Sequence, residues 1–494
     1  MTAASASRRA EPFDVVIVGA GVVGAAVARL LSHYDLSIAL VEAASDVGAG
    51  TSKANTAILH TGFDATPGSI EARLVTRGYE LLRAYAPTVG ISVEQTGAVL
   101  VAWDDEQAST LPTLHDKARA NGYARAEIID AAAAYTLEPH LGPGVTAAMM
   151  VPDEHLVDPW STPIAFATEA VSNGCVLLVD AQVIACHPGN EITMLQIADG
   201  RSIATRFVVN AAGLHGDNLH RMFGLEGFTV RPRRGELIVF DKLARPLLRR
   251  TILPVPTSHT KGVLVAPTVF GNVMLGPTAD DIDDRTATGS TRAGIDGLLD
   301  KGRLIIPALV DEEVTAVYAG LRAATEHSDY QISFHPAQRY VCVGGIRSTG
   351  LSASMAIAEH VVEGLADAGL ALALKDDFRS VRMPNIGEAF PRPYQSAEAI
   401  AASSDYGRIV CHCERVTRGE ILDSIRSEIP ARTLDGVRRR TRALLGRCQG
   451  FFCAATITHL VAEATGQTVA TLLGLERSLE SSGDASSRTP LPPR

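Results

Sequence analysis

The hydrophobic pattern of the chain begins with a strand, a helix and a second strand. Residues 14–18 and 37–41 are short apolar runs of strand length, and apolar residues recur at helical spacing over about residues 22–33. A glycine-rich turn separates the first strand from the helix. This order predicts a βαβ unit and places the chain in the α/β class.

Further along, short apolar runs of strand length alternate with turn residues. The two runs around Phe270-Gly271-Asn272 indicate a hairpin, and they predict a mainly antiparallel sheet inserted into the first domain. Residues 48–68 form a long polar loop of the kind that usually serves a site. A helix is expected over about residues 352–365. The strands expected in this part of the chain are residues 207–210, 236–240, 263–266, 273–275 and 340–343.

Composition excludes some functional classes. The chain has 494 residues and a formal net charge of -10, which argues against a general nucleic-acid binder. No apolar run is long enough to cross a bilayer, and the N-terminus lacks the apolar core of a signal peptide. We therefore expect a cytoplasmic protein without a transmembrane segment, for which peripheral attachment to the inner face of the membrane stays open.

The first turn has the spacing of a dinucleotide-binding fingerprint. Gly19, Gly21 and Gly24 follow the first strand as G-x-G-x-x-G, and Glu42 ends the second strand. Such glycines make the turn, let the backbone approach a pyrophosphate and let helix and strand pack closely. The helix N-terminus would face the phosphates, and Glu42 would accept from a ribose hydroxyl. The motif predicts a dinucleotide cofactor without distinguishing FAD from NAD.

A second segment distinguishes the two cofactors. Residues 51–62, Thr-Ser-Lys-Ala-Asn-Thr-Ala-Ile-Leu-His-Thr-Gly, resemble the loop that runs along the flavin in the D-amino-acid oxidase superfamily. Within it, the sequence is more similar to glycerol-3-phosphate dehydrogenases and L-2-hydroxyglutarate dehydrogenases. Residues 208–213, 261–262 with 276–278, and 345–354 resemble three further motifs of the superfamily, in the expected order.

This resemblance spans residues 13 to about 372 and implies a Rossmann-like FAD-binding domain with an inserted substrate domain. Only one complete fingerprint is found, so we expect electrons to reach FAD directly from substrate. A helix N-terminus after residues 348–352 would stabilise the negative charge of reduced flavin, although a plain Gly-Ser loop has the same pattern. Besides the fingerprint, the implied FAD contacts are Thr51, Ser52, Asn55, Thr56, Val183, Gly213, Gly345, Ser348, Gly350, Leu351 and Ser352.

Three residues are candidates for catalysis. His60 matches the family's active-site histidine and could take the proton of an alcohol hydroxyl, although a lone histidine is often structural. Arg322 matches the arginine that holds the substrate's carboxylate or phosphate, and a structural ion pair is the alternative. Lys261 also resembles an active-site position and could contact the anion or a substrate oxygen.

Four cysteines are grouped near the C-terminus as C-x-C and C-x4-C: Cys411, Cys413, Cys448 and Cys453. Four thiolates can hold a [2Fe–2S] cluster or a structural zinc ion. Zinc sites more often use C-x2-C pairs, so the C-x-C and C-x4-C spacings favour iron–sulfur. An arginine-rich run and a Gly-Arg-Cys-Gln-Gly run lie between and around the pairs. The whole unit resembles the bacterioferritin-associated-ferredoxin type of [2Fe–2S] domain, which also ends the large subunit of anaerobic glycerol-3-phosphate dehydrogenase.

Together these features predict an FAD-dependent dehydrogenase of a small anionic alcohol, with sn-glycerol 3-phosphate implied by the resemblance. Electrons would pass from FAD through the cluster to an acceptor protein or a quinone-linked complex. An L-2-hydroxy acid dehydrogenase and an amine or imino-acid oxidase of the same superfamily also fit. In an interpretation of another class, the C-terminal unit is a redox or iron-binding module, and the flavoprotein is its reductase.

The expected domain plan follows from these motifs. The chain is expected to begin with a polar tail (residues 1–12) and an oxidoreductase core (13–375). A proline-containing linker (376–407), a small helical [2Fe–2S] domain (408–476) and a disordered tail (477–494) follow. Within the core, the FAD part is expected at about residues 13–88, 155–220 and 335–375, and the substrate part at about 89–154 and 221–334.

Overall fold

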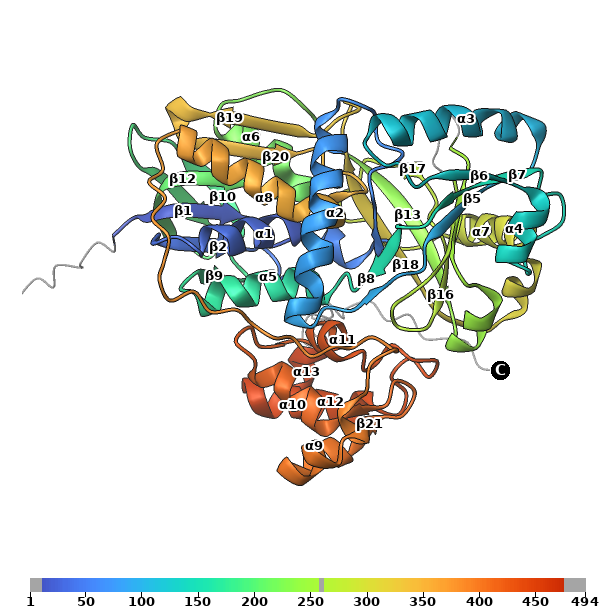
Figure 1. Ribbon diagram of the computed structural model, residues 1–494. Helices are drawn as coiled ribbons and strands as arrows, with labels where there is room; N and C mark the ends of the chain where they lie inside the picture. Colours follow the sequence, from blue (N-terminus) through green and yellow to red (C-terminus); the bar gives the residue numbers. More distant parts are fainter. Residues whose placement is uncertain (1–10, 257–261, 475–494) are drawn as a thin grey trace, which may run out of the picture. The chain divides into compact units, whose positions relative to one another are not determined.

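A computed structural model describes residues 11–256 and 262–474 of the chain. Two units divide it, the first ending at Phe390 and the second beginning at Pro391 (Figure 1). The predicted disordered tail and the candidate Lys261 lie outside the described residues. In the described part of the chain, no helix is long and apolar enough to cross a bilayer.

The first unit contains an eight-stranded sheet built on the predicted βαβ opening. Strand β1 pairs in parallel with β2 and with β12, and β12 pairs in parallel with β20. The inner residues of β1 and β2 are buried, as expected for parallel strands covered on both faces. The strands are β1 (Phe13–Val18), β2 (Ile38–Val41), β9 (Val176–Leu178), β10 (Val183–His187), β11 (Thr193–Ile197), β12 (Ser202–Asn210), β19 (Gln331–His335) and β20 (Tyr340–Gly344).

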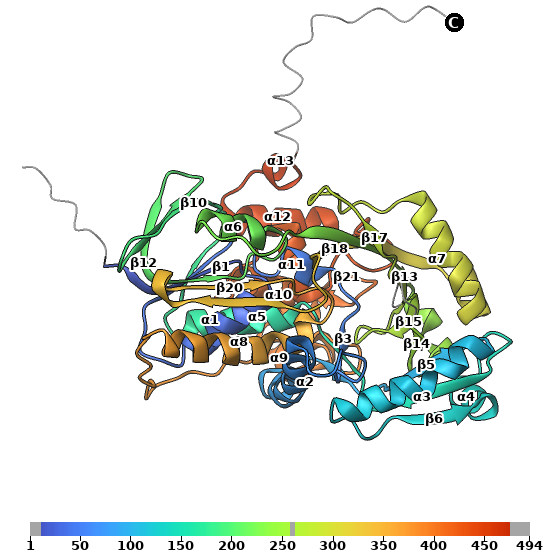
Figure 2. The same ribbon diagram turned by 90° about the horizontal axis from the view of Figure 1, so that it is seen from above.

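Helices α1 (Val22–Leu31), α5 (Ser161–Ser172) and α8 (Gly350–Asp367) pack side by side against this sheet (Figure 2). Helix α2 (Ile70–Val89) crosses α8 at Gly78, where an added Cβ would lie 2.2 Å from a main-chain oxygen of α8. The close approach therefore depends on glycine. Helix α8 begins two residues before the predicted start.

The second sheet of this unit has nine strands in the order β17-β13-β16-β15-β14-β5-β7-β6, with β18 also paired to β13. The predicted antiparallel sheet is confirmed, with one exception, because β14 and β5 are parallel. Its strands are β5 (Ala98–Ala102), β6 (Glu127–Asp130), β7 (Ala147–Val151), β13 (Arg231–Phe240), β14 (Thr251–Pro254), β15 (Leu264–Pro267), β16 (Val273–Gly276), β17 (Asp280–Asp281) and β18 (Val314–Ala324).

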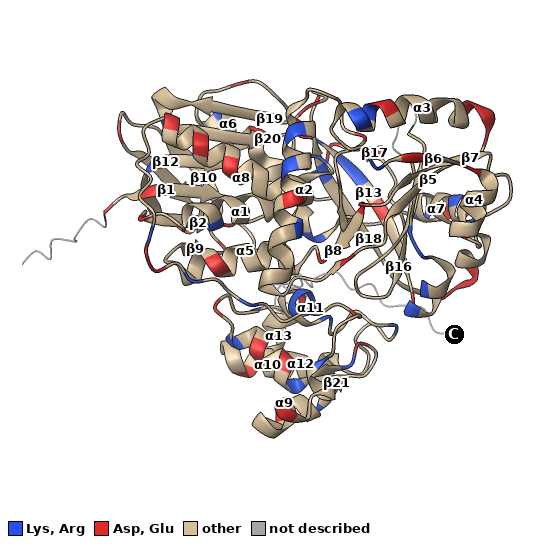
Figure 3. Ribbon diagram, viewed as in Figure 1, with Lys and Arg blue, Asp and Glu red and all other residues tan. Residues whose placement is uncertain are grey.

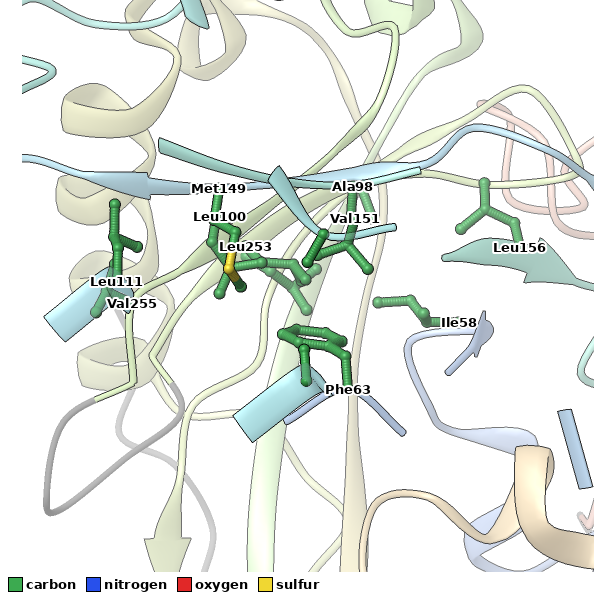
Figure 4. Close-up of a cluster of buried hydrophobic side chains, with 14 of the residues drawn as sticks. Ile58, Phe63, Ala98, Leu100, Leu111, Met149, Val151, Leu156, Leu253 and Val255 are labelled. Atoms are coloured by element: carbon green, nitrogen blue, oxygen red, sulfur yellow. The ribbon is translucent and has the colours of Figure 1, made fainter. Parts of the chain in front are cut away.

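Both faces of the nine-stranded sheet are buried at its centre, where every residue of β5, β15 and β16 is buried. Alternate residues of β5 point to opposite sides, with Leu100 in the cluster shown in Figure 4 and Val99 and Val101 in another. Strand β19, expected in the substrate part, instead forms an antiparallel hairpin with β20 in the first sheet. The two sheets thus provide the fixed strands from which the loops of the candidate site extend.

A three-stranded sheet positions the polar loop of residues 48–68. The loop is not wholly irregular, because it contains a 3-10 turn at Thr51–Lys53 and strand β3 (Ile58–Leu59). Strand β3 pairs antiparallel with β8 (His155–Val157), which in turn pairs with β4 (Val93–Glu94). This pairing ties the loop to a segment almost a hundred residues later in the chain.

The second unit is mainly helical around a small core, to which Val416, Ile421, Val437, Ile457 and Val461 contribute fully buried side chains. A capping box of Thr417 and Glu420 begins helix α10. The helices and strands of the second unit are α9 (Ala397–Ala402), β21 (Ile409–Cys411), β22 (Val416–Thr417), α10 (Arg418–Arg426), α11 (Leu434–Thr441), α12 (Ala454–Thr465) and α13 (Val469–Leu472).

The stretch expected as a linker, residues 376–407, is divided between the units. Up to Phe390 it belongs to the first unit, where the Met383 and Glu388 amides donate to main-chain oxygens of Val89 and Val269 at 2.7 and 2.8 Å. From Pro391 it belongs to the second unit and includes α9. Main-chain hydrogen bonds, which the proline pattern does not reveal, attach the first half to its unit.

Candidate active site

The glycine turn after β1 requires residues without side chains. Gly19 has a φ of +105°, and an added Cβ would lie 2.4 Å from the Ala211 oxygen. An added Cβ on Gly24 would lie 1.9 Å from the Gly19 oxygen. Gly21 caps helix α1, so the N–H groups of the first turn point out of the helix here. The turn has the form that accepts a pyrophosphate.

Glu42 stands at the end of β2 beside this turn. Its carboxylate accepts from the Ala20 amide at 2.7 Å and from the Ala44 amide at 2.8 Å. Burial raises the pKa of Glu42 above its usual range. The Ala181 amide donates to the Glu42 main-chain oxygen at 2.8 Å, which brings the start of β10, with Val183, near the same end of the sheet.

The loop predicted to run along the flavin is held by its own side chains. The Val22 amide donates to Ser52 Oγ at 2.9 Å, and Thr51 Oγ1 donates to the Leu321 oxygen of β18 at 2.8 Å. Asn55 Nδ2 donates to the Ser52 oxygen, and Asn55 Oδ1 accepts from the Ala57 amide. The loop, which also contains Thr56, is therefore fixed between the glycine turn and β18.

The remaining predicted flavin contacts cluster where β12 and β20 end. Gly213 and Gly345 have φ values of +54° and +66° in the turns after these strands. Ser348 is exposed, and Gly350 and Leu351 open helix α8. Ser352 is fully buried in the first turn of α8. Its hydroxyl accepts from the His60 amide at 2.8 Å, which links the helix start to the candidate catalytic residue.

His60 contacts a buried carboxylate that no sequence motif marks. Strands β3 and β8 are antiparallel, and Leu59 pairs with His155. His60, which follows Leu59, therefore lies opposite Glu154, which precedes His155. His60 Nδ1 lies 2.9 Å from Glu154 Oε2. Glu154 is 1% exposed, and its Oε1 accepts from the Thr61 amide and hydroxyl at 2.7 and 2.8 Å. Glu154 thus fixes the imidazole and favours the tautomer that carries its proton on Nδ1.

Arg322 lies on β18, one residue after the oxygen that holds Thr51. Its guanidinium donates only long bonds, 3.4 Å, to the Thr278 oxygen, and no described carboxylate lies within ion-pair distance. Burial and then Arg233 lower the pKa of Arg322 to about 10, so it stays charged at neutral pH. An added Cβ on Gly235 would lie 2.8 Å from its Nη2, so glycine makes room for it. A buried, weakly bonded guanidinium suits an anionic ligand.

The cysteines of the second unit form two thiol pairs. Cys411 and Cys453 are hydrogen-bonded to each other, and so are Cys413 and Cys448. The bond from Cys453 is the main reason that the pKa of Cys411 is lowered to about 6. Main-chain amides also donate to the sulfurs, among them that of Leu444, which has a φ of +71°. Sulfurs that accept hydrogen bonds from main-chain N–H groups are typical of a cluster site.

The thiol pairs bear on the kind of metal centre that the unit could hold. In the described part of the chain, no three Cys, His, Asp or Glu side chains are grouped to hold a single metal ion. A [2Fe–2S] cluster needs two thiolates on each of two irons, and two thiol pairs match that requirement. Helix α11, which precedes the loop of Cys448 in the chain, carries Arg438, Arg439 and Arg440 in its last turn, and Lys and Arg positions are coloured blue in Figure 3. The donor set fits a [2Fe–2S] cluster.

Comparison with known proteins agrees with both expected cofactors. Residues 14–364 match the family of FAD dependent oxidoreductases. The chain belongs to this family. Residues 409–463 match the BFD-like [2Fe-2S] binding domain. This FAD-dependent oxidoreductase therefore contains FAD in its first unit and a [2Fe–2S] cluster in its second, and the glycine turn and the four cysteines are the residues that fit them.

Three similar proteins span most of the oxidoreductase. A glycerol 3-phosphate dehydrogenase from Caloramator mitchellensis is 33% identical over 460 residues, which cover 92% of this chain and 95% of that protein. One subunit of the anaerobic glycerol-3-phosphate dehydrogenase from Escherichia coli K12 is 25% identical, over 92% of this chain and 89% of its own. The FAD-bound L-alpha-glycerophosphate oxidase structure from Mycoplasma pneumoniae has a TM-score of 0.72 and 27% identity, and covers 76% of this chain and 100% of its own.

Proposed function

We propose that this oxidoreductase oxidises sn-glycerol 3-phosphate at its secondary alcohol, which gives dihydroxyacetone phosphate. The observation that carries the proposal is the His60–Glu154 pair, because it holds an imidazole in the tautomer able to accept a hydroxyl proton. An amine oxidase needs no such base. The three similar proteins are named as dehydrogenases or an oxidase of this compound, and two of them match across both units.

In the proposed reaction, the residues divide the work of one oxidation. Arg322 binds the phosphate and so directs the C2 hydroxyl to the histidine. His60 takes the hydroxyl proton on Nε2 while Glu154 holds Nδ1, and the C2–O bond becomes a carbonyl. FAD supplies the acceptor for the hydride that leaves C2. The [2Fe–2S] cluster supplies single-electron transfer to an acceptor protein or a quinone-linked complex.

An anaerobic titration tests the proposal. We expect sn-glycerol 3-phosphate to bleach the flavin absorbance of the purified enzyme, with L-2-hydroxyglutarate and glycine as parallel runs. Bleaching by L-2-hydroxyglutarate alone would reassign the substrate to the hydroxy acids, and bleaching by glycine alone would reassign it to the amines. No bleaching by any of them would contradict the proposal and favour the reductase alternative.

The role of His60 is tested by its removal. Loss of a general base slows proton transfer by about 10²- to 10⁴-fold. We therefore expect His60→Ala to reduce the rate of flavin reduction by that factor while the protein keeps its FAD. Rapid mixing under anaerobic conditions measures the rate, and the flavin spectrum measures the FAD content. A rate within about threefold of the parent would exclude His60 as the base.

A further inference from the structure

The loop between two cluster ligands exposes a pair of phenylalanines. Phe451 is 84% exposed and Phe452 is 70% exposed, and their rings pack edge to face at 5.2 Å. No other large apolar side chain in the described residues is as exposed as Phe451. Left-handed backbone at Gln449 and Gly450, with φ of +50° and +85°, directs the chain outward immediately before the pair. Exposed aromatic side chains of this kind mark contact surfaces rather than ordinary solvent-facing positions.

This aromatic pair is bonded directly to the less buried side of the cluster site. The Phe452 amide donates to the sulfur of Cys448. The Phe451 amide donates to the Cys448 main-chain oxygen at 3.0 Å. Cys448 and Cys413 are partly exposed, whereas Cys411 and Cys453 are buried. The loop that carries the two rings is therefore attached to the more exposed pair of cluster ligands.

The surroundings of the pair are positively charged. Residues 442–461 include two arginines, Arg442 and Arg447, and no acidic residue. His412 and Arg447 are exposed beside the ligands Cys413 and Cys448 in sequence. The acidic side chain of this region, Glu414, is buried and lies 3.2 Å from Arg442. The exposed rim thus consists of one arginine, one histidine and two aromatic rings, and arginine and aromatic residues are enriched at protein interfaces.

We propose that Phe451, Phe452, His412 and Arg447 form the docking surface for an acidic one-electron carrier protein. The inference rests on the proposed function only in that the cluster is the exit for electrons. One electron leaves the reduced cluster for each carrier, so two carriers are reduced for each substrate oxidised. Electron-transfer complexes are small, so a two-ring contact with a charged rim is sufficient. A bilayer would instead require a much larger apolar face.

The test uses the full chain loaded with FAD and cluster, and cytochrome b5 as the acidic carrier, with basic cytochrome c as the opposite-charge probe. Binding of cytochrome b5 to the oxidised, substrate-free enzyme is measured by calorimetry. Reduction of each cytochrome is measured after dithionite reduction of the enzyme and removal of the excess. Neither measurement uses substrate, so a wrong substrate assignment would not affect them.

We expect cytochrome b5 to bind with a salt-sensitive affinity and to be reduced faster than cytochrome c. The double variant Phe451→Ser/Phe452→Ser and the variant Arg447→Glu should each weaken binding by about tenfold. The control Leu473→Ser, a half-exposed apolar residue of the same unit, should not change it. Cluster absorbance should be unchanged in all of them.

Two outcomes would overturn the proposal. In the first, cytochrome b5 fails to bind or is reduced no faster than cytochrome c. In the second, the phenylalanine double variant binds cytochrome b5 like the parent but loses binding to phosphatidylglycerol vesicles, which would identify a membrane contact instead. Loss of cytochrome b5 binding without loss of cluster absorbance would support the docking surface.

Discussion

Replacing Glu154 by glutamine tests whether one buried carboxylate sets the protonation of His60. In the parent, Oε1 accepts two hydrogen bonds from Thr61, and Oε2 lies 2.9 Å from His60 Nδ1. Glutamine has one acceptor oxygen, and the two Thr61 donors favour its placement on their side. Its NH₂ group then faces Nδ1, which must accept, so the imidazole proton moves to Nε2. That tautomer cannot take a proton from the substrate.

The size of the effect follows from the bonds that must be broken to restore the active tautomer. Turning the amide round would leave the buried Thr61 N–H facing another donor, and an unsatisfied buried group costs about 1–3 kcal/mol. A loss of about 2 kcal/mol in the transition state corresponds to a rate lower by about 30-fold. We therefore expect Glu154→Gln to slow flavin reduction by about that factor, with substrate affinity within about threefold of the parent.

Anaerobic rapid mixing with sn-glycerol 3-phosphate separates the two quantities, because the limiting rate reports chemistry and its dependence on concentration reports binding. Glu169→Gln is the matched control. Glu169 is also 1% exposed but contacts Tyr85 and Arg29 instead of the histidine. The reasoning is refuted if Glu154→Gln slows a His60→Ala enzyme as much as it slows the parent, since the carboxylate would then act independently of His60.

Three further predictions concern the cofactor, the substrate anion and the cluster. Arg322→Leu should raise KM for sn-glycerol 3-phosphate by about 10- to 100-fold, since a charged hydrogen bond is worth about 1.5–3 kcal/mol, and an unchanged KM would exclude it as the anion ligand. Gly24→Ala should purify with little flavin, because its Cβ would lie 1.9 Å from the Gly19 oxygen, whereas Gly297→Ala, with open space around it, should keep a full complement. Cys448→Ser should abolish reduction of a one-electron acceptor and leave flavin reduction by substrate intact; loss of both would make the second unit structural.

The parts of the fold that the sequence predicted are those fixed by local spacing. The βαβ opening, the hairpin around residues 270–272 and the helix after β20 all depend on neighbouring residues, and all are present. Their ends were predicted less well. Strand β13 begins at Arg231 instead of residue 236, because its first half pairs with β17 and β18 despite carrying three arginines. Cross-strand partners, absent from a local pattern, decide where such a strand begins.

The candidate site shows the same division between local and distant information. The fingerprint glycines and the paired cysteines are short motifs, so they could be chosen from sequence. Glu154 could not be chosen, because nothing in Asp153-Glu154-His155 separates it from any acidic turn. Its importance comes from the β3–β8 register, which joins positions 94 residues apart. Arg322 is indicated by resemblance alone, and its weak bonding to the Thr278 oxygen is a property of the three-dimensional structure.

This division has a physical cause that bears on which residues perform the chemistry. A motif that binds a cofactor must shape the backbone over a few residues, so it leaves a mark in the local sequence. A residue that orients a base needs only a carboxylate at one point in space, and any two strands in register can provide it. The residue that sets the protonation of His60 should therefore be sought opposite it across β3 and β8, at Glu154, and not in the loop that carries the flavin motif.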